Sequence, residues 1–288
     1  MANVKIVADS TCDLPISVIK NLDIEIIPAN VIFDDQIFSH YEINNDEFYQ
    51  RLAKGEMPST GVPAPKVFKT AFDNALKSSD EAIVFTLSKK LSAMFQTATL
   101  VVKNFFDERV TIVDSETVTL EMGLITYLAA KRAKEGATKE EILQTINDFL
   151  IPNSQLIGVV DTLKFLKRSG RISTISWLIG SVLSIKPIVH IEDGLIKSPG
   201  KVRGKEHALE ILETVAQKIV ENKKSDSIIV GHSHDLVRAL EFEKIIKELP
   251  DAPSDILIGE IGPVVGTHLG PGAIGFAWIG DFAEEWIK

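Results

Sequence analysis

Residues 81–98, EAIVFTLSKKLSAMFQTA, begin as a buried strand and end as a helix. The run at 83–85 is wholly apolar, whereas the apolar residues after Ser92 recur at helical spacing. Two small hydroxyls, Ser88 and Ser92, lie where the strand gives way to the helix. A serine at such a place caps the helix, acts as a nucleophile or donates hydrogen bonds to an anion. The segment therefore predicts an α/β unit and leaves three roles open for its serines.

The same alternation extends through the first half of the chain. Strands are expected at 4–10, 24–33, 81–88, 110–115 and 154–161, with helices near residue 15, at 44–55 and 65–77, from Ser92 onward, and at 119–135 and 138–150. Such alternation is typical of a mostly parallel sheet that is covered by helices on both faces. We therefore assign residues 1–160 to an α/β domain.

The pattern changes after about residue 160. The segment 162–184 is helical but broken at Gly170, and residues 185–203 contain two strands joined by Asp193-Gly194, a strong hairpin signal. Further strands are expected at 227–233, 255–262 and 273–280, with helices between them. Residues 161–288 are therefore predicted to form a second domain, of α+β type with a mixed sheet.

Composition narrows the class of protein. The chain has 288 residues and a formal net charge of -9, and a surplus of acidic residues argues against nucleic-acid binding. A single cysteine, Cys12, excludes an intrachain disulfide and suits a reducing compartment. No segment reaches the roughly 20 apolar residues of a membrane span, and no signal peptide begins the sequence. We expect a soluble, cytoplasmic protein.

Hydroxyl side chains follow several of the predicted strands. They are Ser10 and Thr11, Ser88 and Ser92, Ser115 after Asp114, and Ser59 and Thr60 in the loop MPSTGVPAP. The carboxyl ends of parallel strands share one edge of a sheet, where ligands bind, so these hydroxyls predict a polar patch without a lysine or arginine. The alternative is that each serine or threonine simply caps the next helix.

A second candidate is the glycine-rich segment VVGTHLGPGAIG at 264–275, which contains His268. Its glycines would let backbone amides approach a ligand closely. The spacing matches neither a Walker loop nor a dinucleotide fingerprint, and we expect no helix directly after a strand here, which argues against nucleotide binding. The alternative is a tight loop between two strands with an exposed histidine.

A third candidate, IIVGHSHDLV at 228–237, resembles part of a nucleophile elbow with Ser233 at its tip. The second glycine of that motif is replaced by Asp235, which is typical of a helix N-cap. His232 and His234 are two residues apart, but no third metal ligand is near in sequence. A serine hydrolase that uses Ser233 or Ser92 with His268 stays open as the alternative function.

Two basic segments, 161–173 and 201–209, interrupt this acidic chain. Their cations are Lys164, Lys167, Arg168, Arg171, Lys201, Arg203 and Lys205. Such groups bind phosphate or an acidic partner, or else belong to a solvated helix face. The second explanation fits Lys164 and Lys167 better than Arg203, which ends a predicted strand beside a glycine.

Together these segments resemble the DegV-family fatty-acid-binding proteins, the lipid-carrying subunits of bacterial fatty acid kinase. The resemblance runs through nearly the whole chain, and the ordered blocks that carry it are ADSTCDLP, LSKKLSAMFQTA, VDS at 113–115, DTLKFLKRSGRIS, KPIVHIEDG, KVRGKEHAL and GTHLGPGAIG. Two blocks depart from the family pattern. The usual Thr-Ser-Gln-Pro loop is here STGVPAP, and the usual Gly-Thr-Tyr after Ser92 is AMF.

The resemblance implies two domains and one acyl chain in a buried tunnel between or beside them. It implies that Ser92 and Thr60 bind the fatty-acid carboxylate, with Thr60 aligned less securely. It implies that Arg203 and His268 serve phosphoryl transfer by a separate ATP-dependent kinase subunit, to which a guanidinium or a protonated imidazole would contribute. The protein itself would be a carrier without catalytic activity, and it would need neither a cofactor nor a metal.

Overall fold

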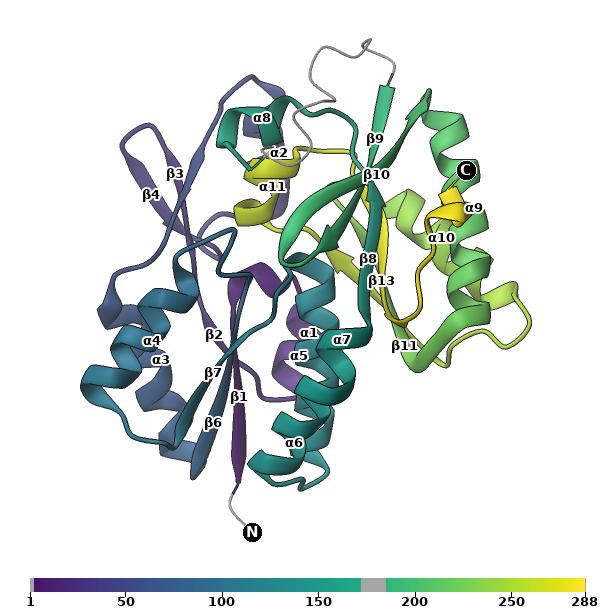
Figure 1. The fold of residues 1–288 in the computed structure, drawn as a ribbon. Coiled ribbons are helices and arrows are strands. Elements are labelled where there is room, and N and C mark those ends of the chain that lie inside the picture. The colour runs from purple at the N-terminus through teal and green to yellow at the C-terminus, as the bar shows by residue number, and fades with distance from the viewer. Residues whose placement is uncertain (1–2, 172–184, 288) are drawn as a thin grey trace.

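The first sheet of the computed structural model is built from four parallel strands in the order β2-β1-β6-β7 (Figure 1). The structure describes residues 3–171 and 185–287. The strands are β1 (Val4–Asp9), β2 (Glu25–Ile27), β6 (Glu81–Thr86) and β7 (Val110–Asp114). All six residues of β1 are buried, as expected for a strand covered on both faces. The predicted α/β architecture of the first domain is confirmed.

Helices cover both faces of this sheet. Figure 1 shows α3 (Pro65–Ser78) and α4 (Met94–Phe105) on one side, with α1 (Ile16–Asn21) and α5 (Thr119–Lys134) on the other. The short helix η1 (Ser10–Cys12) follows β1. After α5 the chain forms α6 (Lys139–Thr145), a π-helical turn (Ile146–Leu150) and α7 (Ile151–Asn153). Thr138 caps α6, because Thr138 and Glu141 form a reciprocal capping box.

The second domain contains the predicted mixed sheet, with six strands in the order β10-β9-β8-β13-β11-β12. They are β8 (Ser154–Val159), β9 (Ile185–Glu192), β10 (Leu195–Arg203), β11 (Lys223–His232), β12 (Asp255–Glu260) and β13 (Ile274–Gly280). The β9–β10 hairpin is confirmed, since Asp193 and Gly194 have φ angles of 51° and 71° in its two-residue turn. Helices α9 (Lys205–Asn222) and α10 (Leu236–Glu248) pack on this sheet, and a short helix (Glu284–Ile287) ends the described chain.

Strand β8 shows where the chain changes sheets. It was expected to complete the first domain, but it pairs with β13 and β9 in the second sheet. The chain therefore passes from the first sheet to the second between β7 and β8. The domain division at residue 160 stays a prediction.

The expected single strand at 24–33 is wrong, because the structure divides it between two sheets. β2 joins the parallel sheet, whereas β3 (Asn30–Phe33) pairs with β4 (Gln36–Ser39) and β5 (Ser59–Gly61) in a small antiparallel sheet. Pro28 lies between them and lacks the amide that a continuous ladder would need. Helix α2 (Asn45–Ala53) follows, as predicted, and Asn44 caps it by accepting from the Glu47 amide at 2.8 Å.

Helix α8 (Lys164–Ser169) covers only the start of the predicted helical segment 162–184. It ends at Gly170, as expected, and Gly170 has the left-handed φ of 75° that favours glycine at a helix C-terminus. Residues 172–184 of that prediction lie outside the described residues.

Helix α5 lies between the two sheets and packs against both (Figure 1). Its Leu120 side chain fits against Gly231 of β11 and Gly259 of β12. A Cβ on Gly231 would overlap with Leu120, and one on Gly259 would lie 2.6 Å from Leu120 Cδ2. One turn further along α5, Gly123 packs so closely against the backbone carbonyl of Cys12 in the first domain that a side chain there would collide with it. These glycines therefore allow α5 to pack closely against both domains.

Buried hydrogen bonds also join the two domains beside α5. Asp13 accepts from the Gly262 amide at 2.9 Å and from Thr119 Oγ1 at 2.7 Å. Asp13 and Thr119 both have left-handed backbones, with φ angles of 48° and 54°, which is unusual for a β-branched threonine. Burial raises the pKa of Asp13 to about 7. Glu121 of α5 is also buried, which raises its pKa to about 7, and it accepts a hydrogen bond from Ser154 Oγ at 2.7 Å.

The contact between Leu120 and Gly231 yields a stability prediction. Gly231→Ala should lower the free energy of unfolding by about 1–3 kcal/mol, because the added methyl group overpacks the interface. In a Leu120→Ala background the same substitution should cost much less, since the overlapping side chain is gone. Gly200→Ala is the control, because its Cβ would meet only Ile287 Cδ1 at 3.4 Å and Ile188 Cδ1 at 3.8 Å. Denaturant unfolding of the four variants would contradict the packing model if Gly231→Ala cost the same in both backgrounds.

Candidate functional site

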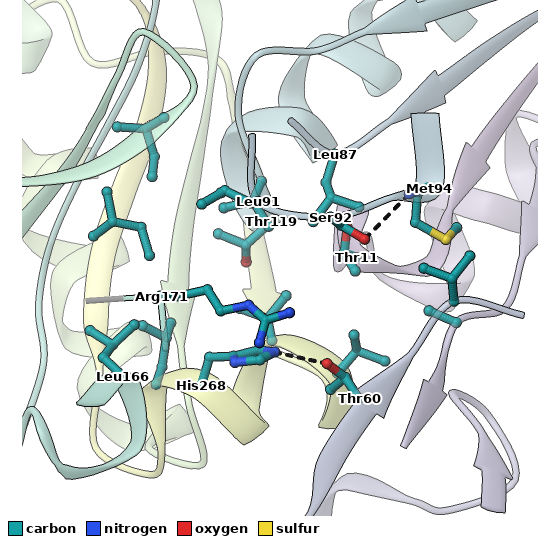
Figure 2. A pocket seen from close by; sticks show the side chains of 18 of the residues that line it. Thr11, Thr60, Leu87, Leu91, Ser92, Met94, Thr119, Leu166, Arg171 and His268 are labelled. Atoms are coloured by element: carbon teal, nitrogen blue, oxygen red, sulfur yellow. Dashed lines mark hydrogen bonds between the residues drawn. The ribbon is translucent and has the colours of Figure 1, made fainter. Parts of the chain in front are cut away.

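A cavity of about 280 Å³ opens between the two domains (Figure 2). Its walls are mostly apolar. The first domain contributes Leu87, Leu91 and Val118, and strands β8, β9 and β10 of the second contribute Leu156, Val189, Ile191 and Ile196. Helix α11 (Pro263–Leu269) adds Val264, Val265 and Leu269. An elongated or bulky apolar ligand suits such a lining better than a polar metabolite does.

The polar side chains of the cavity come from separate parts of the chain. Among the described residues they are Thr11, Thr60, Ser92, Thr119, Arg171 and His268. Three of the four residues singled out from the sequence, Ser92, Thr60 and His268, therefore line one cavity. Their roles toward a ligand stay predictions.

Ser92 lies in the turn between β6 and α4. Its amide and that of Leu91 donate to the Ser88 carbonyl at 3.2 and 2.9 Å. The helix begins at Met94, slightly later than predicted, with Ala93 as N-cap residue, and the Ser92 hydroxyl accepts from the Met94 amide at 3.4 Å. This long bond leaves the hydroxyl hydrogen free to donate into the cavity.

Thr60 and His268 meet across the cavity. Thr60, in the short strand β5, places its Oγ1 3.0 Å from His268 Nε2. His268 lies on α11, so the expectation of a loop between strands at 264–275 is wrong for its first part. Pro263 suits the first position of that helix. Gly266 allows the helix to pack against α2, because a Cβ there would lie 2.7 Å from the Tyr49 hydroxyl oxygen.

His268 is neutral in this environment. Burial, and then the positive charge of Arg171, lower its pKa to about 4. Its Nδ1 is buried and has no hydrogen-bond partner among the described residues. The expectations of an exposed histidine and of a protonated imidazole are both corrected by this environment. At pH 7 the ring acts as a neutral donor or acceptor.

Arg171 is the one cation among the described residues that line the cavity, and the sequence analysis does not distinguish it from its basic neighbours. Figure 2 shows its guanidinium beside the ring of His268. It lies next to Gly170, where the left-handed turn ends α8 and redirects the chain. The expected absence of a cation from the polar patch is therefore wrong. Arg203 is exposed at the end of β10 and is not among the residues that line the cavity.

Three of the remaining strand-end hydroxyls, those of Ser10, Ser88 and Ser115, bond to the protein itself. Ser10 Oγ accepts from the Ala29 amide at 3.0 Å, and Ser115 Oγ donates to the Thr117 carbonyl at 3.2 Å. Ser88 Oγ donates to the Gly194 carbonyl at 2.7 Å. The predicted patch thus divides into residues that face the cavity and residues that hold the structure around it.

Comparison with known proteins agrees with this architecture. The family model described as uncharacterised protein, DegV family, matches residues 3–281. The chain belongs to the DegV family. A DegV domain-containing protein of Caldanaerobacter subterraneus subsp. tengcongensis is 33% identical over 282 residues, which cover 96% of this chain and 98% of that protein.

Solved DegV-family structures share the fold. A fatty-acid-binding member from Thermus thermophilus has a TM-score of 0.87 and 28% identity, and the match covers 98% of this chain and 100% of that one. DegV of Bacillus subtilis, described as a fatty acid binding protein, has a TM-score of 0.82 and 27% identity over 98% and 100% of the two chains. The resemblance to DegV proteins and the two-domain α/β fold predicted from the sequence are confirmed.

The segment around Ser233 lies outside the DegV cavity. Ser233 is fully buried, and its Oγ accepts from the Ala273 amide at 2.7 Å. Asp235 caps α10, as predicted, by accepting from the Arg238 amide at 3.3 Å. Within the described residues, no three His, Cys, Asp or Glu side chains gather as a metal ion would require. The part of the chain that the structure describes also contains no helix both long and apolar enough to span a bilayer.

The environment of His268 leads to a titration prediction. We expect the imidazole to stay neutral from pH 8 down to about pH 5, because its pKa is lowered to about 4. Arg171→Gln should raise this pKa, since a positive charge that disfavours protonation is removed, while burial keeps it below the usual 6.5. The control is Lys167→Gln, which removes an exposed cation outside the cavity. Side-chain NMR titration that placed the wild-type pKa near 6.5, or showed no rise in Arg171→Gln, would contradict this account.

Proposed function

We propose that this DegV-family chain binds a long-chain fatty acid non-covalently, with the acyl chain in the cavity and the carboxylate at its polar end. The observation that carries the proposal is one apolar cavity in which Ser92, Thr60, Arg171 and His268 converge. The T. thermophilus and B. subtilis relatives, which share the fold, are described as fatty-acid-binding proteins.

Burial of the acyl chain provides most of the favourable binding free energy, before the entropic costs of binding are subtracted. A chain with about 14 methylenes gains on the order of 11 kcal/mol on leaving water, at roughly 0.8 kcal/mol per CH₂. The loss of chain and side-chain freedom offsets part of this gain. The sum explains how a carrier holds its lipid without a covalent bond.

The polar end matches a carboxylate. Ser92 and Thr60 each provide a hydroxyl donor, and the guanidinium of Arg171 balances the negative charge. Because His268 is neutral, it adds no second charge that would bind the carboxylate more tightly. Hydroxyl donors satisfy the carboxylate and leave one of its oxygens accessible.

We further propose that the protein presents this carboxylate to a separate ATP-dependent kinase subunit in the cytoplasm. A carboxylate oxygen would attack the γ-phosphorus of ATP while the bond to ADP breaks, and the resulting acyl phosphate would enter phospholipid metabolism. The chain carries no Walker or dinucleotide motif of its own, which is consistent with a carrier that has no catalytic activity alone. Arg203, exposed at the end of β10, would contact the kinase, and His268 would serve the transfer at the cavity.

The geometry favours this function over a serine hydrolase. Ser233 does not line the cavity and already accepts a backbone hydrogen bond. Ser92 and His268 do share the cavity, but the hydrogen bond of the His268 ring goes to Thr60. A general base should instead lie within hydrogen-bond reach of its nucleophile.

Native mass spectrometry of the purified protein tests the central proposal. A retained fatty acid, released on denaturation and identified by its mass, is the expected result. An empty protein that fails to bind added fatty acids and cleaves ester substrates would support the hydrolase instead.

Removing a carboxylate donor should weaken lipid retention. Ser92→Ala should cost about 1.5–3 kcal/mol of binding free energy, or roughly 10- to 150-fold in Kd, because a charged acceptor loses a donor. Thr60→Ala should act in the same direction. Titration with a fluorescent fatty acid measures both effects. Unchanged affinity in both single variants and in the double variant would remove this assignment of the carboxylate site.

Arg203 and His268 should matter for a different step. Arg203→Ala and His268→Ala should keep bound fatty acid and a normal fold, because Ser92, Thr60 and Arg171 remain. Both variants should lose acyl-phosphate formation when mixed with a kinase subunit and ATP. Lipid content is measured beside kinase turnover. A variant that emptied of lipid while its remaining complex turned over normally would overturn this division of roles.

A further inference from the structure

Ser88 is a buried serine that the carboxylate site does not use directly. It comes shortly after β6, is 1% exposed, and is not among the residues that line the cavity. Its backbone carbonyl accepts from the amides of Leu91 and Ser92. These two bonds close the turn that carries Ser92 to the cavity.

The Ser88 hydroxyl joins this turn to the other domain. It accepts from the Lys90 amide at 3.2 Å and donates to the carbonyl of Gly194 at 2.7 Å. Gly194 belongs to the tight turn of the β9–β10 hairpin and is buried. A Cβ at Gly194 would lie 2.5 Å from Ser88 Oγ, so the close approach depends on glycine.

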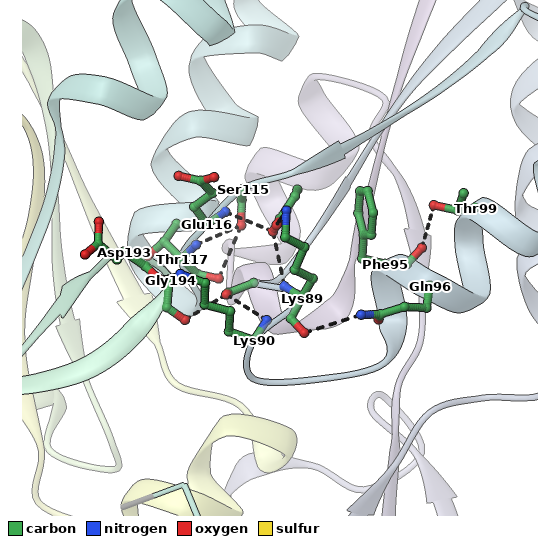
Figure 3. A network of polar contacts seen from close by, with 12 residues as sticks. Lys89, Lys90, Phe95, Gln96, Thr99, Ser115, Glu116, Thr117, Asp193 and Gly194 are labelled. Carbon is green, nitrogen blue, oxygen red and sulfur yellow. Dashed lines mark hydrogen bonds and ion pairs between the residues drawn. The ribbon is translucent and has the colours of Figure 1, made fainter. Parts of the chain in front are cut away.

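A second contact reinforces the same junction. Lys90 Nζ donates to the carbonyl of Asp193 at 2.6 Å, and Figure 3 shows this lysine reaching toward the hairpin turn. Ile191 and Ile196, on either side of the turn, line the cavity. The hairpin is therefore one wall of the cavity, and it meets the Ser92 turn at Ser88.

We propose that Ser88 is the positioning residue for Ser92, an inference that rests on the proposed binding of a carboxylate by Ser92. The hydroxyl fixes the turn at residues 88–92 to the hairpin wall, and this keeps the Ser92 hydroxyl directed at the head group. Without it, the buried Gly194 carbonyl loses its donor and the Lys90 amide loses an acceptor. The turn then moves, and Ser92 spends part of its time out of reach of the ligand.

The test compares Ser88→Ala, Ser92→Ala and the double variant with the wild type. Dissociation constants are measured for hexadecanoic acid and for hexadecanol, which lacks the carboxylate. Ser88→Ala should weaken binding of the acid roughly 3- to 10-fold, and binding of the alcohol less. The double variant should bind the acid as Ser92→Ala does, because Ser88 acts only through Ser92.

Two further variants make the test specific. Ser227→Ala removes another buried serine hydroxyl, 3% exposed, which lies on β11, donates to Asp255 Oδ2 at 2.9 Å and is not among the residues that line the cavity. Its affinity for the acid should stay at the wild-type value. Gly194→Ala displaces the Ser88 hydroxyl without removing it, and should weaken acid binding as Ser88→Ala does. Thermal unfolding identifies any variant that is not folded.

The outcomes separate this inference from the proposed function. A wild-type protein that binds no fatty acid contradicts the function itself. If the wild type binds, the positioning role is overturned by unchanged affinity in Ser88→Ala and Gly194→Ala. It is also overturned by an equal loss in Ser227→Ala, by a Ser92→Ala variant that binds normally, or by single-variant effects that multiply in the double variant.

Discussion

The arrangement of the two domains depends on the packing of helix α5 between their two sheets. Leu120 of α5 fills the space that two strand glycines leave open, and Gly123, one turn further along the helix, packs against the Cys12 carbonyl. Neither contact has room for an additional methyl group. Because both domains share this helix, they hold a defined relative position, and a cavity between them can have walls of constant shape.

The two domains contribute different kinds of side chain to the lining of that cavity. The parallel sheet delivers hydroxyls such as Thr11 and Ser92 just beyond its strands, whereas the mixed sheet and the hairpin deliver aliphatic side chains. Helix α11 adds His268, which burial keeps neutral. The apolar and the polar side chains of the cavity thus come from different parts of the chain.

Sequence predicted the features that local chemistry controls. Strand-end hydroxyls share an edge in any parallel sheet, and family motifs marked Ser92 in particular. Arg171 was not predictable as a cavity residue, because its position depends on the left-handed turn at Gly170. Helix α11 was not predictable from local sequence, because the glycine-rich segment has low helix propensity. Its Gly266 instead allows close packing against Tyr49.

The shared helix also imposes an order on biosynthesis. Leu120 leaves the ribosome roughly a hundred residues before Gly231, the partner that will cover it. At 5–20 residues per second, the apolar face of α5 stays uncovered for about 5–20 s. During that interval Leu120 lacks the two strands, β11 and β12, that bury it in the folded protein.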